Sequence, residues 1–280
     1  MVGYAECIEM TDYLKLWNES VEAYDGYGST FSQYEDTSRF LVEVAGIRPG
    51  QTVVDLACGT GITTRHILDR VTSDGRVYAV DFSSVMLEKA KQNIRDENVT
   101  YIVSRAEDVA DVMPEKVDVV VCNSAFWQFD DYERVFASVA SLLKRDGIFV
   151  FDLNQQFYDF GPTEESHRKR VMEFISSELA RRGYPTESRL REKLKKEHIV
   201  KLAQSSGYSL PLTETLEIPG STIEDTIRFL RIPAVAPFFE GVPDTVRDDI
   251  LDTIYRILKD DAAQIPKNRW IAFVFRADVE

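Results

Sequence analysis

The sequence contains few of the residues that form disulfides or bind transition metals. It has three cysteines (Cys7, Cys58 and Cys122) and three histidines among 280 residues. Three cysteines cannot all pair, and these show neither CxxC spacing nor a neighbouring cluster of histidines. We therefore expect free thiols, no disulfide framework and no metal centre.

Long apolar runs are also absent. The first twenty residues carry acidic and polar side chains where a signal peptide has a basic start and an apolar run. No later stretch is both long enough and apolar enough to cross a bilayer. The sequence thus predicts a cytoplasmic protein with no membrane partner.

Positive charge is scarce, with 33 Lys and Arg against 47 Asp and Glu and a formal net charge of -14. Such a charge repels a phosphate backbone, so we expect no nucleic-acid partner. The segment from Glu165 to Lys201 is an exception, with eleven Lys or Arg and six Glu. It either attracts an anionic substrate or an acidic carrier protein, or forms the solvated face of helices with Glu–Lys pairs, and we favour the second interpretation.

Short apolar runs alternate with amphipathic helical segments over residues 38–155. The runs at 51–57, 76–81, 99–103, 117–123 and 148–154 predict strands that are covered on both faces. This alternation is typical of an α/β protein with a doubly wound parallel sheet. A charged helical region follows from Thr163 to about Ser206, then further strands are predicted at 209–218 and 269–277.

The turn after the first predicted strand indicates a ligand site. Gly59 and Gly61 let a ligand approach the backbone closely, and the start of the next helix favours an anionic group. A dinucleotide fingerprint would require a third glycine at position 64, which is Thr64. Asp81, at the end of the second strand, suits the hydroxyls of a ribose. Asp55 favours a ligand ammonium over a pyrophosphate, so a ligand with one carboxylate, one ammonium and one ribose fits all these groups.

Five motifs in order resemble the class I S-adenosylmethionine-dependent methyltransferases of the small-molecule type, which include quinone-pathway and natural-product enzymes. The motifs are Asp55-Leu-Ala-Cys-Gly-Thr-Gly61, Val80-Asp-Phe-Ser83, Ala106-Glu-Asp108, Val119-Val-Val-Cys-Asn123 and Leu142-Leu-Lys-Arg-Asp-Gly147. The resemblance implies a Rossmann-like seven-stranded sheet with an antiparallel last strand and a helical cap. It also implies S-adenosyl-L-methionine as the cofactor and S-adenosyl-L-homocysteine as the product.

The same resemblance assigns the cofactor residues. It places Ala57, Gly59 and Gly61 against the methionine part, Asp81 on the ribose, Phe82 and Met86 on the adenine, and Asn123 near the sulfonium. Ala106 and Glu107 are expected at the adenine edge. Tyr24 belongs to a Tyr-Asp segment that resembles the one folding over the cofactor in small-molecule methyltransferases. Cys58 is expected to be a small spacer in the loop rather than a reagent.

The acceptor pocket is expected to be aromatic. Tyr27 and Tyr34 from the N-terminal segment, and Phe126 and Trp127 after the fourth strand, form a surface suited to a hydrophobic or aromatic small molecule. The catalytic residue is not evident from the sequence, and His198 is a weak candidate for a general base.

These expectations divide the chain into an N-terminal lid segment (1–37), a cofactor-binding core (38–155), a helical cap insertion (156–206) and a C-terminal completion of the sheet with substrate-pocket helices (207–280). The expected function is methyl transfer to a small molecule by in-line displacement. Two alternatives remain, a non-catalytic S-adenosylmethionine-binding module with a closed pocket and an NAD-dependent oxidoreductase. The sequence does not predict the acceptor atom or the oligomeric state.

Overall fold

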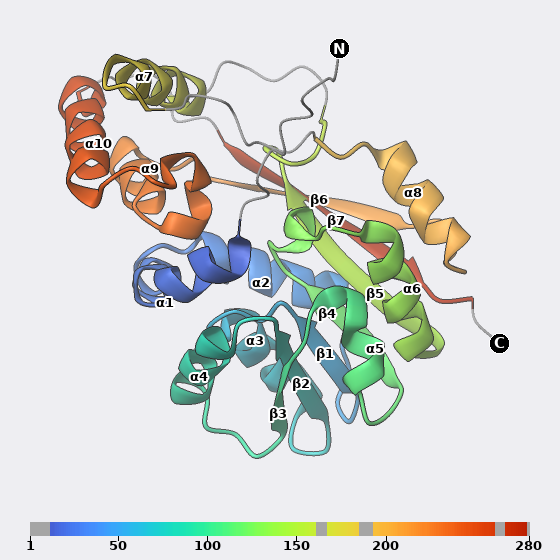
Figure 1. Cartoon of the computed structure of the whole chain (residues 1–280). Coiled ribbons are helices and arrows are strands. Elements are labelled where there is room, and N and C mark those ends of the chain that lie inside the picture. Colours follow the sequence, from blue (N-terminus) through green and yellow to red (C-terminus); the bar gives the residue numbers. More distant parts are fainter. Residues whose placement is uncertain (1–11, 161–166, 185–192, 261–266, 279–280) are drawn as a thin grey trace, which may run out of the picture.

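A mixed sheet lies at the centre of the computed structural model, which describes residues 12–160, 167–184, 193–260 and 267–278 (Figure 1). Its strands are β1 (Thr52–Leu56), β2 (Arg76–Asp81), β3 (Val99–Val103), β4 (Val117–Cys122), β5 (Leu143–Asn154), β6 (Leu212–Ile218) and β7 (Asn268–Arg276). Their order is β3-β2-β1-β4-β5-β7-β6. Strands β1 to β5 are parallel, and β7 runs antiparallel to both β5 and β6. The predicted fold, including the antiparallel last strand, is confirmed.

Helices surround the sheet. They are α1 (Tyr13–Thr30), α2 (Gln33–Val44), α3 (Ile62–Val71), α4 (Ser84–Asn93), α5 (Val109–Val112), α6 (Tyr132–Leu142), α7 (His167–Arg181), α8 (Lys196–Ser205), α9 (Ile223–Leu230) and α10 (Asp244–Leu258). Short 3-10 segments are η1 (Ala106–Asp108), η2 (Phe126–Gln128), η3 (Pro233–Val235) and η4 (Pro237–Phe239). Side chains of α2 and α3, such as Leu41 and Ile67, pack on one face of the sheet, and side chains of α6 and α8, such as Phe136 and Ile199, pack on the other.

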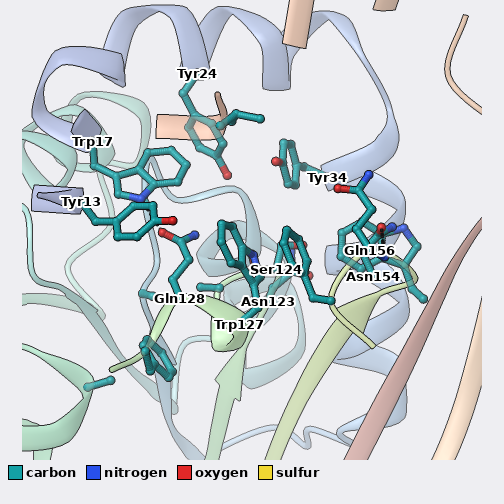
Figure 2. A pocket seen from close by; sticks show the side chains of 18 of the residues that line it. Tyr13, Trp17, Tyr24, Tyr34, Asn123, Ser124, Trp127, Gln128, Asn154 and Gln156 are labelled. Carbon is teal, nitrogen blue, oxygen red and sulfur yellow. Dashed lines mark hydrogen bonds between the residues drawn. The ribbon is translucent and has the colours of Figure 1, made fainter. Parts of the chain in front are cut away.

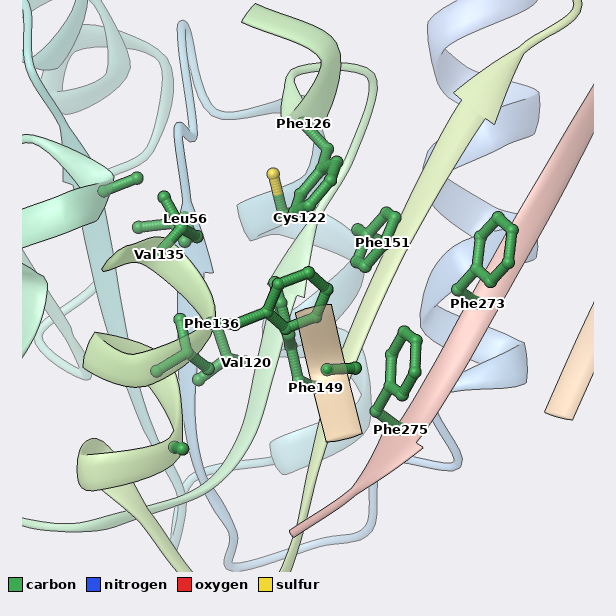
Figure 3. Close-up of a cluster of buried hydrophobic side chains, with 14 of the residues drawn as sticks. Leu56, Val120, Cys122, Phe126, Val135, Phe136, Phe149, Phe151, Phe273 and Phe275 are labelled. Carbon is green, nitrogen blue, oxygen red and sulfur yellow. The ribbon is translucent and has the colours of Figure 1, made fainter. Parts of the chain in front are cut away.

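Aromatic rings fill the second of these layers. Phe126 and Phe151 stack with ring centroids 3.7 Å apart and an interplanar angle of 8°. Phe136 meets Phe149 edge-on at 5.7 Å, and Phe273 from β7 stacks on Phe151 at 5.4 Å. Figure 3 shows these rings between α6 and the strands β4, β5 and β7. This cluster joins the last strand to the middle of the sheet.

The segment predicted as one helical insertion supplies helices to two different clusters. Val171 and Ile175 of α7 are buried with side chains of α9 and α10, whereas Ile199 and Ala203 of α8 are buried against the sheet. Figure 1 shows α7, α9 and α10 together, next to α1 and apart from α8. The division follows from the apolar faces, because each helix lies where its own buried stripe finds a partner.

The N-terminal part of the described chain is helical. Helix α1 begins at the cap residue Asp12, whose Oδ1 accepts a hydrogen bond from the Lys15 amide at 3.1 Å. Helix α2 covers residues 33–44, so the boundary predicted at residue 37 falls inside a helix. In the described part of the chain, no helix has the length and the apolar composition needed to span a membrane.

Candidate functional site

A large cavity opens where the parallel strands end. Its volume is about 940 Å³. Among the predicted cofactor residues, those that line it are Tyr24, Ala57, Gly59, Asp81, Phe82, Met86, Ala106, Glu107 and Asn123. Tyr34 and Trp127 from the predicted acceptor pocket line it as well. Open α/β sheets bind ligands in this position, outside the carboxyl ends of the strands.

The loop between β1 and α3 has a left-handed backbone at three positions. The φ angles are 60° at Ala57, 55° at Gly59 and 95° at Gly61. An added Cβ on Gly59 would lie 3.6 Å from Tyr24 Cε1, in a space that faces the cavity. An added Cβ on Gly61 would lie only 2.7 Å from Ile94 Cδ1. Gly59 therefore keeps the cavity wall open.

Gly61 has a different task from the one predicted for it. It is the N-cap residue of α3, and it does not belong to the described lining of the cavity. Its missing side chain lets α3 approach Ile94 and Ala90. The predicted contact of Gly61 with the methionine part of the cofactor stays a prediction, and the space on its Cβ side is filled by these two side chains.

Asp81 joins the loop to the end of β2. Its side chain is only 5% exposed. Its Oδ2 accepts a hydrogen bond from the Gly59 amide and its Oδ1 accepts one from the Ser83 amide, each at 2.9 Å. Burial raises the pKa of Asp81 to about 6, so the group is mainly a carboxylate at neutral pH. Each carboxylate oxygen keeps acceptor capacity after these two bonds.

Asp55 lies behind the loop and not in the cavity. It is 1% exposed, and its Oδ2 accepts a hydrogen bond from Thr64 Oγ1 at 2.5 Å. Burial raises the pKa of Asp55 to about 7. The prediction of a direct contact with a ligand ammonium is therefore not supported. Asp55 instead ties the end of β1 to the first turn of α3, where a threonine takes the position of a third glycine.

One wall of the cavity comes from the residues after β2 and β3. Glu107 is 7% exposed, and its Oε1 accepts a hydrogen bond from the Asp130 amide at 3.3 Å. Its Oε2 lies 3.4 Å from Nε of Arg105, which also pairs with the Asp130 carboxylate at 2.9 Å. Met86 is 2% exposed and presents an apolar surface to the same space. This wall offers acceptor oxygens beside an apolar surface.

Asn123, at the end of β4, is held by hydroxyl groups. Its Nδ2 donates to Ser38 Oγ at 2.8 Å and to Thr63 Oγ1 at 3.1 Å. The next residue, Ser124, has a φ of 59°, and its amide donates to Asp152 Oδ1 at 2.6 Å. A non-glycine residue in the left-handed region that faces a cavity is a feature of functional sites. The end of β4 is thus fixed from α2, α3 and β5 at once.

Aromatic side chains form the roof and one side of the cavity (Figure 2). Trp127 stacks on Phe157 with centroids 3.9 Å apart, and its Nε1 donates to the Ser124 carbonyl at 3.1 Å. Tyr24 and Tyr34 have ring centroids 5.3 Å apart. Burial raises the pKa of both phenols, so they are neutral near pH 7. These rings surround the space above Asn123.

Two residues predicted for the acceptor pocket lie elsewhere. Tyr27 is buried among Phe31, Phe229 and other apolar side chains, and Phe126 is buried against Phe151 in the sheet core. Neither belongs to the described cavity lining. The physical reason is the same for both. Each ring has other aromatic rings as neighbours, and packing against them buries it away from the cavity.

His198 is also away from the cavity. It lies exposed on α8, which packs against α6, and it does not belong to the described cavity lining. No histidine occurs among the described lining residues. The weak prediction of a catalytic role for His198 is therefore not supported.

The two cysteines that the structure describes are free thiols, as predicted. Cys58 is buried beside Ala79 and Leu87, and burial raises the pKa of its thiol and that of Cys122. Neither thiol forms a disulfide. Cys7 lies outside the described residues. Among the residues that the structure describes, no group of His, Cys, Asp and Glu is arranged to hold a metal ion.

Sequence reasoning missed several lining residues. Trp17 donates from Nε1 to Gln128 Oε1 at 2.6 Å, and both line the cavity together with Tyr13. Trp17 precedes Tyr24 by seven residues, so the two share one face of α1, and this spacing could have revealed it. Asn154 and Trp270 line the other end of the cavity, where β5 and β7 pair. No short motif marks those two positions.

Residues 54–151 match a family model described as a methyltransferase domain. The chain is 30% identical over 188 residues to a Geobacillus thermodenitrificans protein described as an uncharacterized methyltransferase, covering 64% of this chain and 83% of the relative. The chain belongs to the class I S-adenosylmethionine-dependent methyltransferases. The cofactor of this methyltransferase is therefore S-adenosylmethionine.

Other relatives of the methyltransferase match a shorter part of their own length. It is 29% identical over 140 residues to malonyl-[acyl-carrier protein] O-methyltransferase 2 of Coxiella burnetii, covering 50% of this chain and 55% of that protein. The chain spans about half the length of the first curated relatives that it matches. Among solved structures, the cyclopropane synthase MmaA2 of Mycobacterium tuberculosis has a TM-score of 0.57 at 17% identity, covering 96% of this chain and 99% of that one. This likeness concerns the fold.

Proposed function

We propose that this protein transfers the methyl group of S-adenosylmethionine to a small organic acceptor with an apolar or aromatic part. One observation carries the proposal. A single cavity of about 940 Å³ runs from the glycine loop and Asp81 to the aromatic side chains around Trp127. This volume is near the upper end of the range of roughly 300–1,000 Å³ for small-molecule sites, which suits a cofactor and an acceptor together.

The cofactor end of the cavity fits the proposed ligand. We propose that the free acceptor capacity of Asp81 binds the ribose hydroxyls, with Ala57 and Gly59 beside the methionine part. Phe82 and Met86 would then contact the adenine, with Ala106 and Glu107 at its edge. The open Cβ space at Gly59 and the buried carboxylate of Asp81 support this assignment. Tyr24 and Asn123 border the same space and complete the proposed site.

When bound, S-adenosylmethionine supplies an activated methyl group on a positively charged sulfur. The chain then has to align the acceptor and exclude water. Asn123 is fixed by two hydroxyl groups, and neutral phenols and the Trp127 ring cover the space above it. Because the described lining has no histidine, an amine or thiol acceptor demands less of this site than a hydroxyl does.

The alternatives from the sequence receive less support. A binding module without catalysis was expected to have a closed pocket, and the observed cavity extends well past the proposed cofactor end. Family membership removes the oxidoreductase alternative. The cytoplasmic location, the lack of a nucleic-acid partner and the four-segment division of the chain stay predictions.

The substitution Asp81→Asn tests the proposal. It removes a charged acceptor while keeping the size of the side chain, and charge-assisted hydrogen bonds contribute about 1.5–3 kcal/mol each. We expect the affinity for S-adenosylhomocysteine, measured by isothermal titration calorimetry, to fall by roughly tenfold or more. Transfer from S-adenosylmethionine labelled in its methyl group, measured over a panel of small amines, thiols and phenols, should fall with it.

Asp74→Asn is the matched control, because Asp74 is exposed in the turn before β2. It should leave the affinity unchanged. An Asp81→Asn protein that unfolds at the wild-type temperature and binds the ligand as tightly as wild type would remove the ribose assignment. A wild-type protein that binds neither form of the cofactor would refute the proposed function itself.

A further inference from the structure

The two ends of the cavity carry opposite charge. The lining at the β2 and β3 end includes the acids Asp81, Glu107 and Asp130 and a single cation, Arg105, which pairs with two of them, and Asp12 lines the cavity at the start of α1. The lining at the β7 end includes three cations, Lys193, Lys267 and Arg269, and no described acid. This polarity is unexpected in a chain whose net charge is -14.

The cations at the β7 end are only partly neutralised. Lys267 Nζ and Arg269 Nε share one carboxylate, that of Glu217, at 3.0 Å and 3.5 Å. Glu217 is on β6, it is 44% exposed, and it does not belong to the described lining. Lys193 forms no ion pair with any residue that the structure describes. Among the residues that the structure describes, this end of the cavity therefore has an excess of positive charge.

A buried donor without a partner lies at the same end. Trp270 is 4% exposed and lines the cavity, and its Nε1 has no hydrogen-bond partner among the described residues. An indole nitrogen can only donate, and a buried donor that is left unpaired costs about 1–3 kcal/mol. A ligand oxygen at this position would remove that cost. The donor indicates an acceptor oxygen, and the nearby cations indicate that the group carrying this oxygen is anionic.

The strand order gives the distance from this group to the reacting centre. Asn123 ends β4, and Trp270 lies on β7, two strand intervals away in the order β4-β5-β7. Neighbouring strands are about 4.8 Å apart, so the separation is roughly 10 Å. Figure 2 likewise shows Asn154 and Gln156 on one side of the pocket and Tyr13 and Trp17 on the other, with Asn123 between them.

We propose that the acceptor carries an anionic group, a carboxylate or a phosphate, that binds at the β7 end of the cavity to Lys193, Lys267, Arg269 and the indole N–H of Trp270. The methylated atom lies at the other end of the acceptor, roughly 10 Å away by the strand spacing. The aromatic stack of Trp127 and Phe157 contacts the apolar part between them. Because Trp270 is only 4% exposed, an oxygen that accepts from its N–H has to enter the cavity, which a small molecule can do. This inference rests on the proposed function, since it describes the acceptor of that reaction.

Two fluorescent probes that differ in one anionic group test the inference. They are 8-anilinonaphthalene-1-sulfonate and the uncharged N-phenyl-1-naphthylamine, each titrated into the full chain saturated with S-adenosylhomocysteine. We expect the double variant Lys193→Gln/Lys267→Gln to weaken binding of the sulfonate at least tenfold and to change binding of the uncharged probe less than twofold. Both lysines are exposed, so these substitutions should preserve the fold. Trp270→Phe keeps a ring but removes the N–H, and it should weaken binding of the sulfonate alone by at least threefold.

The double variant Lys91→Gln/Arg134→Gln is the matched control. It removes the same charge from exposed side chains outside the cavity lining and should change neither probe. Displacement of the bound sulfonate by phenyl phosphate and by phenylacetate distinguishes the two anionic groups, because the stronger competitor identifies the group that the site prefers.

Three outcomes would overturn the inference. They are an anionic probe that does not bind, equal effects of the lysine substitutions on both probes, and displacement by neither competitor. The affinity for S-adenosylhomocysteine is measured on every variant. Intact affinity combined with one of these outcomes refutes the anionic acceptor and leaves the proposed function in place, whereas a wild-type protein without this affinity refutes the proposed function.

Discussion

At the scale of single residues, the loop after β1 shows two glycines of one motif with different surroundings. Both have a left-handed backbone, so any side chain adds strain at either position. Gly59 faces the cavity, whereas Gly61 faces Ile94 and Ala90. The proposed binding role therefore applies to Gly59, and the role of Gly61 is to let two helices approach each other.

The substitutions Gly59→Ala and Gly61→Ala should separate these roles. We expect Gly59→Ala to lower the affinity for S-adenosylhomocysteine by roughly tenfold or more, with a stability loss of about 1–2 kcal/mol from the backbone strain. Gly61→Ala should lose more stability, because the new methyl group displaces Ile94, while the folded protein keeps its affinity within about threefold. Calorimetric titration and urea unfolding measure the two quantities. Equal losses of affinity in both variants would contradict the assignment.

The glycine pair also shows what a sequence motif can predict at this scale. Asp81 and Gly59 were correctly expected to lie at the strand ends. A residue at or just after the end of a parallel strand lies at the carboxyl edge of the sheet, whatever its side chain. Asp55 belongs to the same motif, yet its side chain points to Thr64. The direction of a side chain depends on the neighbour that it finds across the fold, and the motif alone does not contain that neighbour.

At the scale of secondary-structure elements, α1 borders the cavity and contacts the core partly through polar side chains. Ser83 Oγ donates to Asn18 Oδ1 at 2.6 Å, and Lys89 Nζ lies 2.8 Å from Glu22 Oε2. Exposed ion pairs of this kind contribute roughly 0–1 kcal/mol each. Trp17 adds a bond to Gln128 across the cavity. Leu16 and Val21 are buried as well, so α1 is held by both polar and apolar contacts.

We expect α1 to become more protected when the cofactor site is filled. Trp17 and Tyr24 line the cavity, so a bound ligand adds contacts to this helix. Hydrogen exchange followed by mass spectrometry should show at least tenfold slower exchange of amides over residues 13–30 with saturating S-adenosylhomocysteine. Helix α8 is the internal control, because it packs against α6 away from the cavity. Unchanged exchange in α1 would show that the helix does not respond to the ligand.

The elements themselves were largely predictable. The strands β2 and β3 have the predicted bounds, because continuous apolar runs between polar turns have no other stable arrangement in such a fold. The packing of α7 and α8 in separate clusters was not predicted. Two amphipathic helices of similar composition give no sign in the sequence of which surface each one covers.

At the scale of the whole molecule, three buried carboxyl groups lie at or near the ends of β1, β2 and β5. Burial raises the pKa of Asp55 to about 7, that of Asp81 to about 6 and that of Asp152 to about 7. A carboxyl group with a raised folded-state pKa favours folding while it is protonated. Its contribution to the free energy of unfolding is fully present below the pKa of the group in the unfolded chain, about 3.9. This contribution is lost as the pH rises through the pKa of the group in the folded protein.

The substitution Asp152→Asn should expose this effect. The side chain is 0% exposed, and its Oδ2 has no partner among the described residues. The variant keeps an acceptor for the Ser124 amide but cannot ionise. Near pH 4 we expect similar free energies of unfolding for variant and wild type. Between pH 4 and pH 7 the variant should become more stable relative to wild type, by an amount on the order of 4 kcal/mol at most.

Urea unfolding at half-unit pH steps measures this difference. Asp74→Asn serves again as the exposed control, and its difference from wild type should stay flat over the same range. If the difference in free energy of unfolding between Asp152→Asn and wild type also stays constant with pH, the Asp152 carboxyl group is not desolvated in the folded protein.

The position of β7 has a consequence for the order in which the molecule folds. Strand β7 is formed by residues 268–276, yet it lies inside the sheet between β5 and β6. During synthesis the ribosome releases β5 long before β7, so the backbone edge of β5 that pairs with β7 has no partner in that interval, and Phe151 lacks its contact with Phe273. An unpaired edge of this kind is a template for association with other chains. The incomplete chain therefore passes through a stage in which aggregation competes with folding, and that stage ends only when residue 276 becomes available.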